Sequence, residues 1–261
     1  MKYEHLIVEQ ENRVRVVFMN RPEKRNALNE KMAAELIAAL YEADADSGVG
    51  AVVLTGKGDS FCAGGDLSDF AQASTKTAPV LHQEGMASTE MFKMGLKMTK
   101  PLVAAVNGHA IGGGYGLAAM CHLALANEKA KFGTPEIKVG IFPFVIFPLL
   151  IRAVGPRRAL EMALTGRSIS AAEAKEIGLV NKVCPPEDLL RESLALASEV
   201  AGWSPLVLRL GLNAFNTVMD MEINKAFDYL NTLRVIDFMS DDLKEGAMAF
   251  TQKRSPQWSG R

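Results

Sequence analysis

Apolar and polar residues alternate over two short stretches near the start of the chain, and the spacing then becomes helical. Leu6 to Val8 and Val14 to Phe18 alternate like paired strands, with Glu11-Asn12 as the turn between them. Asn29 is a favoured helix N-cap residue. The apolar residues after it recur every four positions, at Met32, Leu36 and Leu40. This start predicts a hairpin followed by an amphipathic helix.

Three later stretches are apolar throughout, and helical segments separate them. They begin at Ala51, Leu102 and Leu123. Short strands without a polar face are typical of a parallel sheet that is buried on both sides and joined by crossover helices. The pattern therefore predicts an α/β fold.

The last third of the chain has a helical pattern. Ser170-Ala-Ala-Glu173 has the spacing of a capping box, and Gly178 is placed to end that helix. Pro185-Pro186 precedes a helix predicted over 187–201. Beyond Pro205 three further helices are predicted, over 206–218, 222–238 and 242–253. We therefore divide the chain into a core over 1–200 and a C-terminal helical region over 201–261.

The bulk composition argues against several classes of protein. A length of 261 residues suits one large α/β domain with an appended helical segment. The net charge of −1 gives no electrostatic reason to expect nucleic acid or an anionic membrane as a partner. No apolar run reaches the roughly 18 residues that a transmembrane helix needs. The start of the chain has a strand pattern, and we expect no signal or transit peptide.

The cysteines and histidines are few. Cys62, Cys121 and Cys184 are scattered and odd in number, which suits a reducing cytoplasm. The four histidines show no metal-ligand spacing with one another or with the cysteines, so we expect no metal site.

The segment from Pro101 to Leu117 carries the strongest chemical signal. A buried strand, Leu102 to Val106, leads through Asn107-Gly108 to Gly112-Gly113-Gly114, and an apolar helix follows. Bare glycine backbone at a helix N-terminus lets a ligand atom approach unpaired N–H groups, which favour negative charge. The junction could hold an oxygen that becomes an anion during a reaction, although many glycine turns only let a helix pack on a sheet.

A second glycine turn strengthens the chemical interpretation. The strand from Ala51 to Thr55 is followed by a loop and by Phe61-Cys-Ala-Gly-Gly-Asp-Leu67, again with small residues before a helix. Two such turns could each aim an N–H at one carbonyl oxygen. Donors of this kind contribute roughly 3–4 kcal/mol each in acyl chemistry.

Together these motifs resemble the crotonase (enoyl-CoA hydratase/isomerase) superfamily. Besides the two glycine turns, the similar segments run nearly from end to end: Asn20–Asn29, Phe132–Ile137, Leu164–Ser170, Ala174–Val180 and Glu245–Phe250. The resemblance implies a crotonase-like spiral of ββα units. It also implies that the C-terminal helical region packs against neighbouring subunits, in a homotrimer or a dimer of trimers.

The resemblance also implies a site for an acyl-CoA, with CoA as part of the substrate and no separate cofactor. The backbone N–H groups of Gly65 and Gly113 would form an oxyanion hole that stabilises an enolate. CoA would lie against the N-terminal loop and the first glycine turn, at Ala27, Leu28, Ala63, Asp66 and Leu67. Lys24 and Arg25 would lie near its phosphates, or else form a solvated basic pair. Phe250 and Lys253 would reach the CoA of a neighbouring subunit.

The carboxylates decide which reaction the resemblance implies. Hydratases of the family use two glutamates around one water. The position of the first is Gly116 here, two residues beyond the triple glycine. The second is filled by Glu136, which could otherwise be a surface carboxylate after Pro135. Asp66, Asp69 and Glu90 are further candidates without an assigned place.

The segment after Glu136 also departs from the hydratases, which carry a glycine-rich run beyond the proline matching Pro143. Here Phe142, Phe144 and Phe147 are expected to line the site, raise the pKa of Glu136 and exclude water, or else to pack in the core. One carboxylate in a dry pocket suits isomerisation of 3-enoyl-CoA to 2-enoyl-CoA. Hydration of 2-enoyl-CoA is the alternative. Decarboxylation, thioester hydrolysis and a non-catalytic acyl-CoA-binding protein are less favoured.

Overall fold

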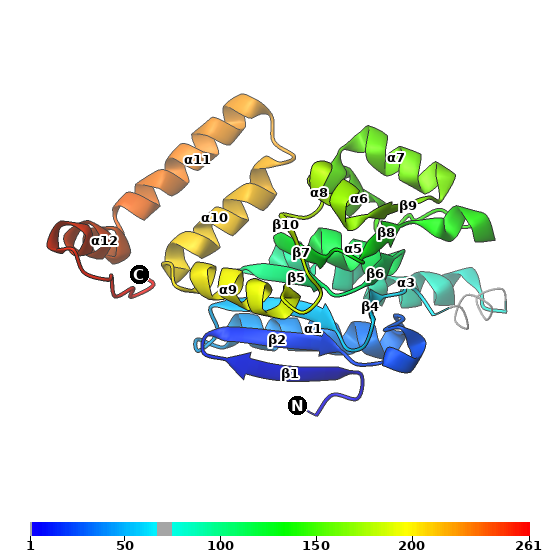
Figure 1. Cartoon of the computed structure of the whole chain (residues 1–261). Helices are drawn as coiled ribbons and strands as arrows, with labels where there is room; N and C mark the ends of the chain where they lie inside the picture. Colours follow the sequence, from blue (N-terminus) through cyan, green and yellow to red (C-terminus); the bar gives the residue numbers. More distant parts are fainter. Residues whose placement is uncertain (1, 67–74) are drawn as a thin grey trace.

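Six strands form the larger of two sheets in the computed structural model, which describes residues 2–66 and 75–261 (Figure 1). Their order follows the chain: β1 (Leu6–Glu11), β2 (Val14–Met19), β3 (Ala51–Gly56), β5 (Leu102–Val106), β7 (Leu123–Asn127) and β10 (Lys182–Cys184). The predicted hairpin of β1 and β2 is antiparallel, and every other neighbouring pair is parallel. The expected parallel sheet is therefore confirmed.

A smaller sheet lies at the carboxyl ends of these strands. It contains, in order, β4 (Ser60–Cys62), β6 (His109–Ile111), β8 (Lys131–Gly133) and β9 (Ser168–Ser170). The pairs β3–β4, β5–β6 and β7–β8 each place one strand in the large sheet and the next in the small one. In the described part of the chain, a helical segment then leads from each pair to the next strand of the large sheet. This arrangement confirms the spiral of ββα units.

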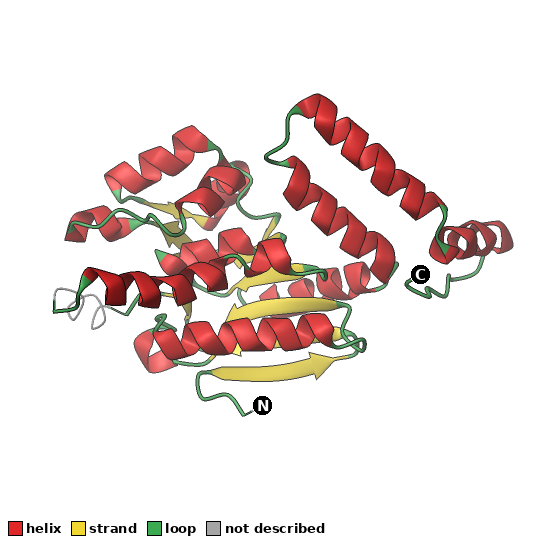
Figure 2. Ribbon diagram, turned by 180° about the vertical axis from the view of Figure 1, so that it is seen from behind, coloured by secondary structure: helices red, strands yellow, loops and turns green. Residues whose placement is uncertain are grey.

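Helices cover both faces of the large sheet (Figure 2). Those of the core are η1 (Pro22–Lys24), α1 (Glu30–Ala45), α3 (Ala78–Phe92), α4 (Met94–Lys97), α5 (Gly113–Met120), η2 (Pro135–Val139), α6 (Phe147–Val154), α7 (Pro156–Thr165), α8 (Ala171–Glu176) and α9 (Leu189–Ala201). The Asn29 side chain caps α1 by accepting a hydrogen bond from the Met32 N–H. Ser170 caps α8 in the same way through the Glu173 N–H. Both predicted helix starts are confirmed.

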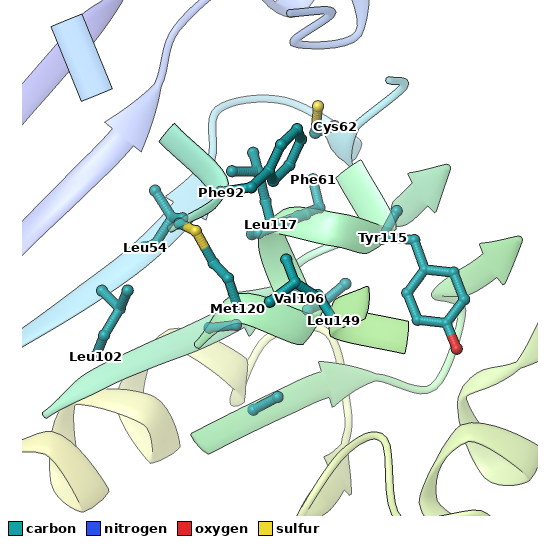
Figure 3. Packing of buried hydrophobic residues seen from close by; sticks show 14 of the residues in the cluster. Leu54, Phe61, Cys62, Phe92, Leu102, Val106, Tyr115, Leu117, Met120 and Leu149 are labelled. Atoms are coloured by element: carbon teal, nitrogen blue, oxygen red, sulfur yellow. The ribbon is translucent and has the colours of Figure 1, made fainter. Parts of the chain in front are cut away.

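The main core lies between α1, α5 and the two sheets. The apolar face predicted for α1 is fully buried at Met32, Leu36 and Leu40. Figure 3 shows the packing around α5, where Leu117 and Met120 lie among side chains of the strands and of α3. The core thus holds the start of α5, which carries the triple glycine, in a fixed position.

The last three helices project from the core as a C-terminal arm, defined here as residues 205–261 (Figures 1 and 2). They are α10 (Pro205–Val218), α11 (Ile223–Phe238) and α12 (Asp241–Gln252), within two residues of the predicted bounds. The buried carboxylate of Asp242 accepts hydrogen bonds from Ser204, Ser259 and Gly260. These bonds fasten the end of the chain to the corner between α9 and α10.

Candidate active site

The two glycine turns predicted from the sequence lie against each other. Gly64 has a φ of +92°, and a Cβ added there would lie 2.7 Å from the carbonyl oxygen of Ile111 and 3.3 Å from the nitrogen of Gly113. A side chain at Gly64 would therefore strain the backbone and also collide with the second turn. The absence of that side chain is what lets the two turns meet.

The N–H groups of Gly65 and Gly113 point away from backbone acceptors for two different structural reasons. Gly113 is the first residue of α5, and the first N–H groups of a helix have no acceptor within the helix. Gly65 forms a parallel bridge with Leu28, whose N–H donates to Gly64 O at 2.7 Å and whose carbonyl accepts from Asp66 N–H at 2.9 Å. In such a bridge, Leu28 bonds to the residues on either side of Gly65. The N–H of Gly65 itself therefore points away from Leu28.

The N-terminal loop forms one side of this site. Ala27 is buried, Leu28 and Ala63 are half-buried, and a Cβ added at Gly113 would lie 2.8 Å from Cδ1 of Leu28. Lys24 and Arg25 are exposed on the outer surface of the loop.

Asp66 has a structural use. Its carboxylate pairs with Arg21 at 3.3 Å, and Arg21 also donates to the carbonyl of Ala27 at 2.6 Å. The ion pair ties the first glycine turn to the N-terminal loop. Leu67 and Asp69 lie outside the described residues.

Glu136 faces the second glycine turn from the short helix that follows β8. It lies in η2, directly after β8, and a Cβ added at Gly112 would lie 2.6 Å from its Oε1. Its Oε2 is buried and has no hydrogen-bond partner in the described part of the chain. Burial raises the pKa of the carboxyl above its usual value, although a hydrogen bond from its own backbone N–H lowers it. Glu136 can therefore act as a proton acceptor beside bare backbone.

The position of the hydratases' first glutamate is filled by neighbouring side chains. A Cβ added at Gly116 would lie 2.3 Å from Cγ2 of Ile146 and 2.9 Å from Cε1 of Phe92. Both side chains are buried, and Phe92 also lies 3.5 Å from a Cβ added at Gly113. Neither Phe92 nor Ile146 belongs to a sequence motif, so the sequence alone did not indicate that they lie at the site.

One expectation for the phenylalanines is wrong. Phe144 is 75 % exposed and does not fill the space beside Gly116, which Ile146 occupies. Phe142 is half-buried, and its ring centroid lies 5.0 Å from that of Phe144 and 4.9 Å from that of Phe147. The backbone turn before α6 directs Ile146 inward and Phe144 outward. The segment has no regular strand or helix spacing, so the sequence pattern could not predict which of the two side chains is buried.

Of the remaining candidates, Glu90 forms ion pairs with lysines, and Phe250 and Lys253 lie on the C-terminal arm. The hydrogen bond from Lys93, with another from Lys97, lowers the pKa of the exposed Glu90 carboxylate to about 2. Phe250 is 88 % exposed and Lys253 is exposed at the end of α12, a helix that lies across the molecule from the strands of the small sheet (Figure 1). Residues 2–66 and 75–261 contain no cluster of three or more side chains suited to hold a metal ion. In the same ranges no helix is long and apolar enough to cross a membrane.

A model of the enoyl-CoA hydratase/isomerase family matches residues 9–261. The chain belongs to the enoyl-CoA hydratase/isomerase family. It is 38 % identical to a crotonyl-CoA hydratase of Syntrophomonas wolfei over 97 % of both chains. It is 37 % identical to a 2,3-dehydroadipyl-CoA hydratase of Escherichia coli, over 98 % of this chain and 99 % of that one.

Solved structures of the family agree with this match. The crystal structure of an enoyl-CoA hydratase from Bacillus anthracis superposes with a TM-score of 0.93 at 30 % identity, covering 99 % of this chain and 100 % of that one. The enoyl-CoA hydratase/isomerase fold thus includes both sheets and the C-terminal arm.

Proposed function

We propose that this enzyme moves the double bond of an enoyl-CoA thioester from C3 to C2. CoA would be part of the substrate, and no separate cofactor would be needed. One observation carries the proposal: Ile146 and Phe92 fill the space beside Gly116, while Glu136 faces the glycine turn with an unpartnered oxygen. This arrangement supplies one base and leaves no space for a second carboxylate beside Gly116.

The proposed reaction is a proton transfer through an enolate. Glu136 removes a proton from C2 of the 3-enoyl thioester, and the electron pair moves into the conjugated dienolate, with charge on the thioester oxygen. The N–H groups of Gly65 and Gly113 donate to that oxygen, each contributing about 3–4 kcal/mol. Glu136 then returns the same proton to C4, the electron pair forms the C2–C3 double bond, and the carboxylate is regenerated.

CoA would be bound by shape more than by charge. We assign its pantetheine arm to Ala27, Leu28 and Ala63, which lie at the glycine turns, and its phosphates to the neighbourhood of Lys24 and Arg25. Leu67 is assigned to the same side of the site by the resemblance alone. Because the three cysteines are free thiols, we place the enzyme in a reducing compartment such as the cytoplasm.

We also propose that the enzyme is a homotrimer or a dimer of trimers. The C-terminal arm exposes several large apolar side chains, each at least 57 % exposed: Phe215, Ile223, Phe227, Phe238, Met239 and Phe250. Apolar surface on this scale marks an interface. In such an assembly Phe250 and Lys253 would reach the CoA of a neighbouring subunit.

Hydration of 2-enoyl-CoA is the second candidate, because the Syntrophomonas wolfei and Escherichia coli relatives are named as hydratases. Assays with matched 3-enoyl-CoA and 2-enoyl-CoA esters, read by the absorbance of the conjugated thioester, distinguish the two. Isomerisation requires the absorbance to rise with the 3-enoyl ester and to change little with the 2-enoyl ester. Rapid loss of absorbance with the 2-enoyl ester would favour hydration instead.

A further inference from the structure

Two asparagine side chains hold the loop that leads into the first glycine turn. This loop, residues 56–60, joins β3 to β4. Nδ2 of Asn26 donates to the carbonyl oxygens of Lys57 and Ser60 at 2.9 and 2.8 Å. Nδ2 of Asn107 donates to the carbonyl oxygen of Gly58 at 2.8 Å, and its Oδ1 accepts from the Gly56 N–H at 3.1 Å. The loop is thus bonded on two sides.

Each asparagine belongs to a different segment of the site. Asn26 is fully buried in the N-terminal loop at a φ of +55°, and its Oδ1 accepts from the Arg21 N–H at 2.9 Å. Asn107 lies between β5 and β6, and β6 leads directly to the second glycine turn. The carbonyl of Asn107 accepts in turn from Asn127 Nδ2 at 2.5 Å. Side-chain amides therefore connect the N-terminal loop, the first turn and the second turn.

We propose that Asn26 and Asn107 are positioning residues that set the distance between the two oxyanion donors, Gly65 and Gly113. The inference rests on the proposed role of those donors. An oxyanion hole requires donors about 2.7–3.1 Å from the oxygen, and a misplacement of about 1 Å can cost about 10²-fold in rate. Residues 57–59 lie between β3 and β4 and have no ladder of their own, so the side-chain amides decide where β4 and the first turn begin.

Substitution of Asn107 by Asp tests the proposal with little change in shape. In Asn107→Asp one oxygen still accepts from Gly56, but the other replaces the donor and faces the carbonyl of Gly58. Two facing acceptors repel, so we expect kcat to fall at least tenfold at pH 8, with KM for the CoA ester within about threefold. The introduced carboxyl can donate again once it is protonated. The ratio of variant to unmodified kcat should therefore rise as the pH falls through that carboxyl's pKa.

A second variant and a control complete the experiment. Asn26→Asp places an acceptor against Lys57 and Ser60, and we expect the same recovery at low pH. Asn181→Ala is the control, because Asn181 also accepts from a strand N–H, that of Ala124 at 2.8 Å, but lies apart from the glycine turns. It should keep the kcat of the unmodified enzyme.

Four results would overturn the proposal: a folded Asp variant with unchanged kcat, a loss confined to KM, an equal loss in Asn181→Ala, or Asp variants that fail to fold. The last would make the asparagines requirements of the fold and not of the donors. The failure of the proposed function is a separate result, because the unmodified enzyme would then not convert the 3-enoyl ester, whatever the variants do.

Discussion

Glu136 is held where its charged form is unfavourable, and this suits it to accept a proton. Its Oε1 lies against the bare backbone of Gly112, and its Oε2 is buried with no partner among the described residues. A base needs a pKa near the operating pH, and burial moves that of Glu136 upward. The same burial costs stability, as is common where function needs an unsatisfied group.

Glu136→Gln should abolish turnover, by at least about 10²-fold, and leave binding of a CoA ester nearly unchanged. The amide keeps the shape but cannot accept the proton. Because the folded-state pKa of Glu136 is raised, the protonated form is the stabilising one, and its contribution is lost as the pH rises through that pKa. Thermal unfolding at pH 7 should therefore show the variant to be at least as stable as the unmodified enzyme. Turnover within about tenfold of unmodified would remove Glu136 from the mechanism.

The pH dependence should identify the same carboxyl. We expect kcat/KM to rise with pH through an apparent pKa above the usual glutamate value, since only the ionised carboxylate accepts a proton. Steady-state rates from pH 4 to 9, with a stability control at each pH, measure it. A profile that stays flat down to the ordinary glutamate pKa would mean that burial does not tune the base.

Gly113 offers a matched pair of substitutions. Proline is favoured at the first position of a helix, where the N–H that it removes has no acceptor within the helix, and its Cβ meets the flexible end of Leu28. Gly113→Pro should therefore keep the fold and cost about 10²–10³-fold in kcat through the loss of one oxyanion donor. Gly113→Ala keeps the N–H and meets the same end of Leu28, so it should retain much more activity. Equal rates for the two variants, with matching circular dichroism, would leave the triple glycine as a packing device.

At the scale of elements, the close approach of α5 to the segment before α6 sets the chemistry at Gly116. Ile146 occupies the volume that a side chain at Gly116 would need, and Phe92 approaches from the end of α3. The packing of these three elements thus leaves no room for a glutamate side chain at Gly116. A single substitution there cannot restore the second carboxylate.

Gly116→Glu alone should lower the thermal midpoint, because overpacking a core costs about 1–3 kcal/mol or more. Combined with Ile146→Gly it gains space, and the new carboxylate could share the site with Glu136. We expect the double variant to hydrate 2-enoyl-CoA at least tenfold faster than the unmodified enzyme. Ile146→Gly alone is the control, since it opens the space without adding a carboxylate. Hydration that is already rapid in the unmodified enzyme would contradict the isomerase proposal.

The sequence predicted the long elements well and the contacts between them poorly. The helices of the arm and the capping of α1 and α8 were predictable, since spacing and caps are local signals. The strands of the small sheet have three residues each, too few for periodicity to show how they pair. The sequence showed that glycine replaces the first glutamate at position 116. It did not show that Ile146, 30 positions further along, packs against that glycine. Which side chain fills such a gap depends on tertiary packing.

On the scale of the whole molecule, the C-terminal arm exposes apolar side chains that a single chain leaves uncovered. Phe227 and Phe238 on α11 are 66 % and 61 % exposed, although the core is closely packed. The bonds from Ser204, Ser259 and Gly260 to Asp242 fix the base of the arm. The arm is thus a firmly attached apolar surface, which favours a specific interface over loose association.

We expect a native mass three times the 28.2 kDa of one chain, or six times, by light scattering. Phe227→Glu combined with Phe238→Glu places charge on the exposed face of α11 and should shift the protein to the monomer. Leu190→Glu, on the exposed surface of α9 outside the arm, is the matched control and should keep the assembly. A monomeric unmodified protein would exclude the proposed trimer.

The strand order of the large sheet has a consequence for how the protein forms during synthesis. Because β1, β2, β3, β5, β7 and β10 follow one another in both chain and sheet, each new turn of the spiral can add to an edge that already exists. A growing chain could therefore gain order from its beginning onward without waiting for distant partners. Until the next strand arrives, that edge is open to another nascent chain. The three residues of β10 finally leave only a short edge at that side of the sheet.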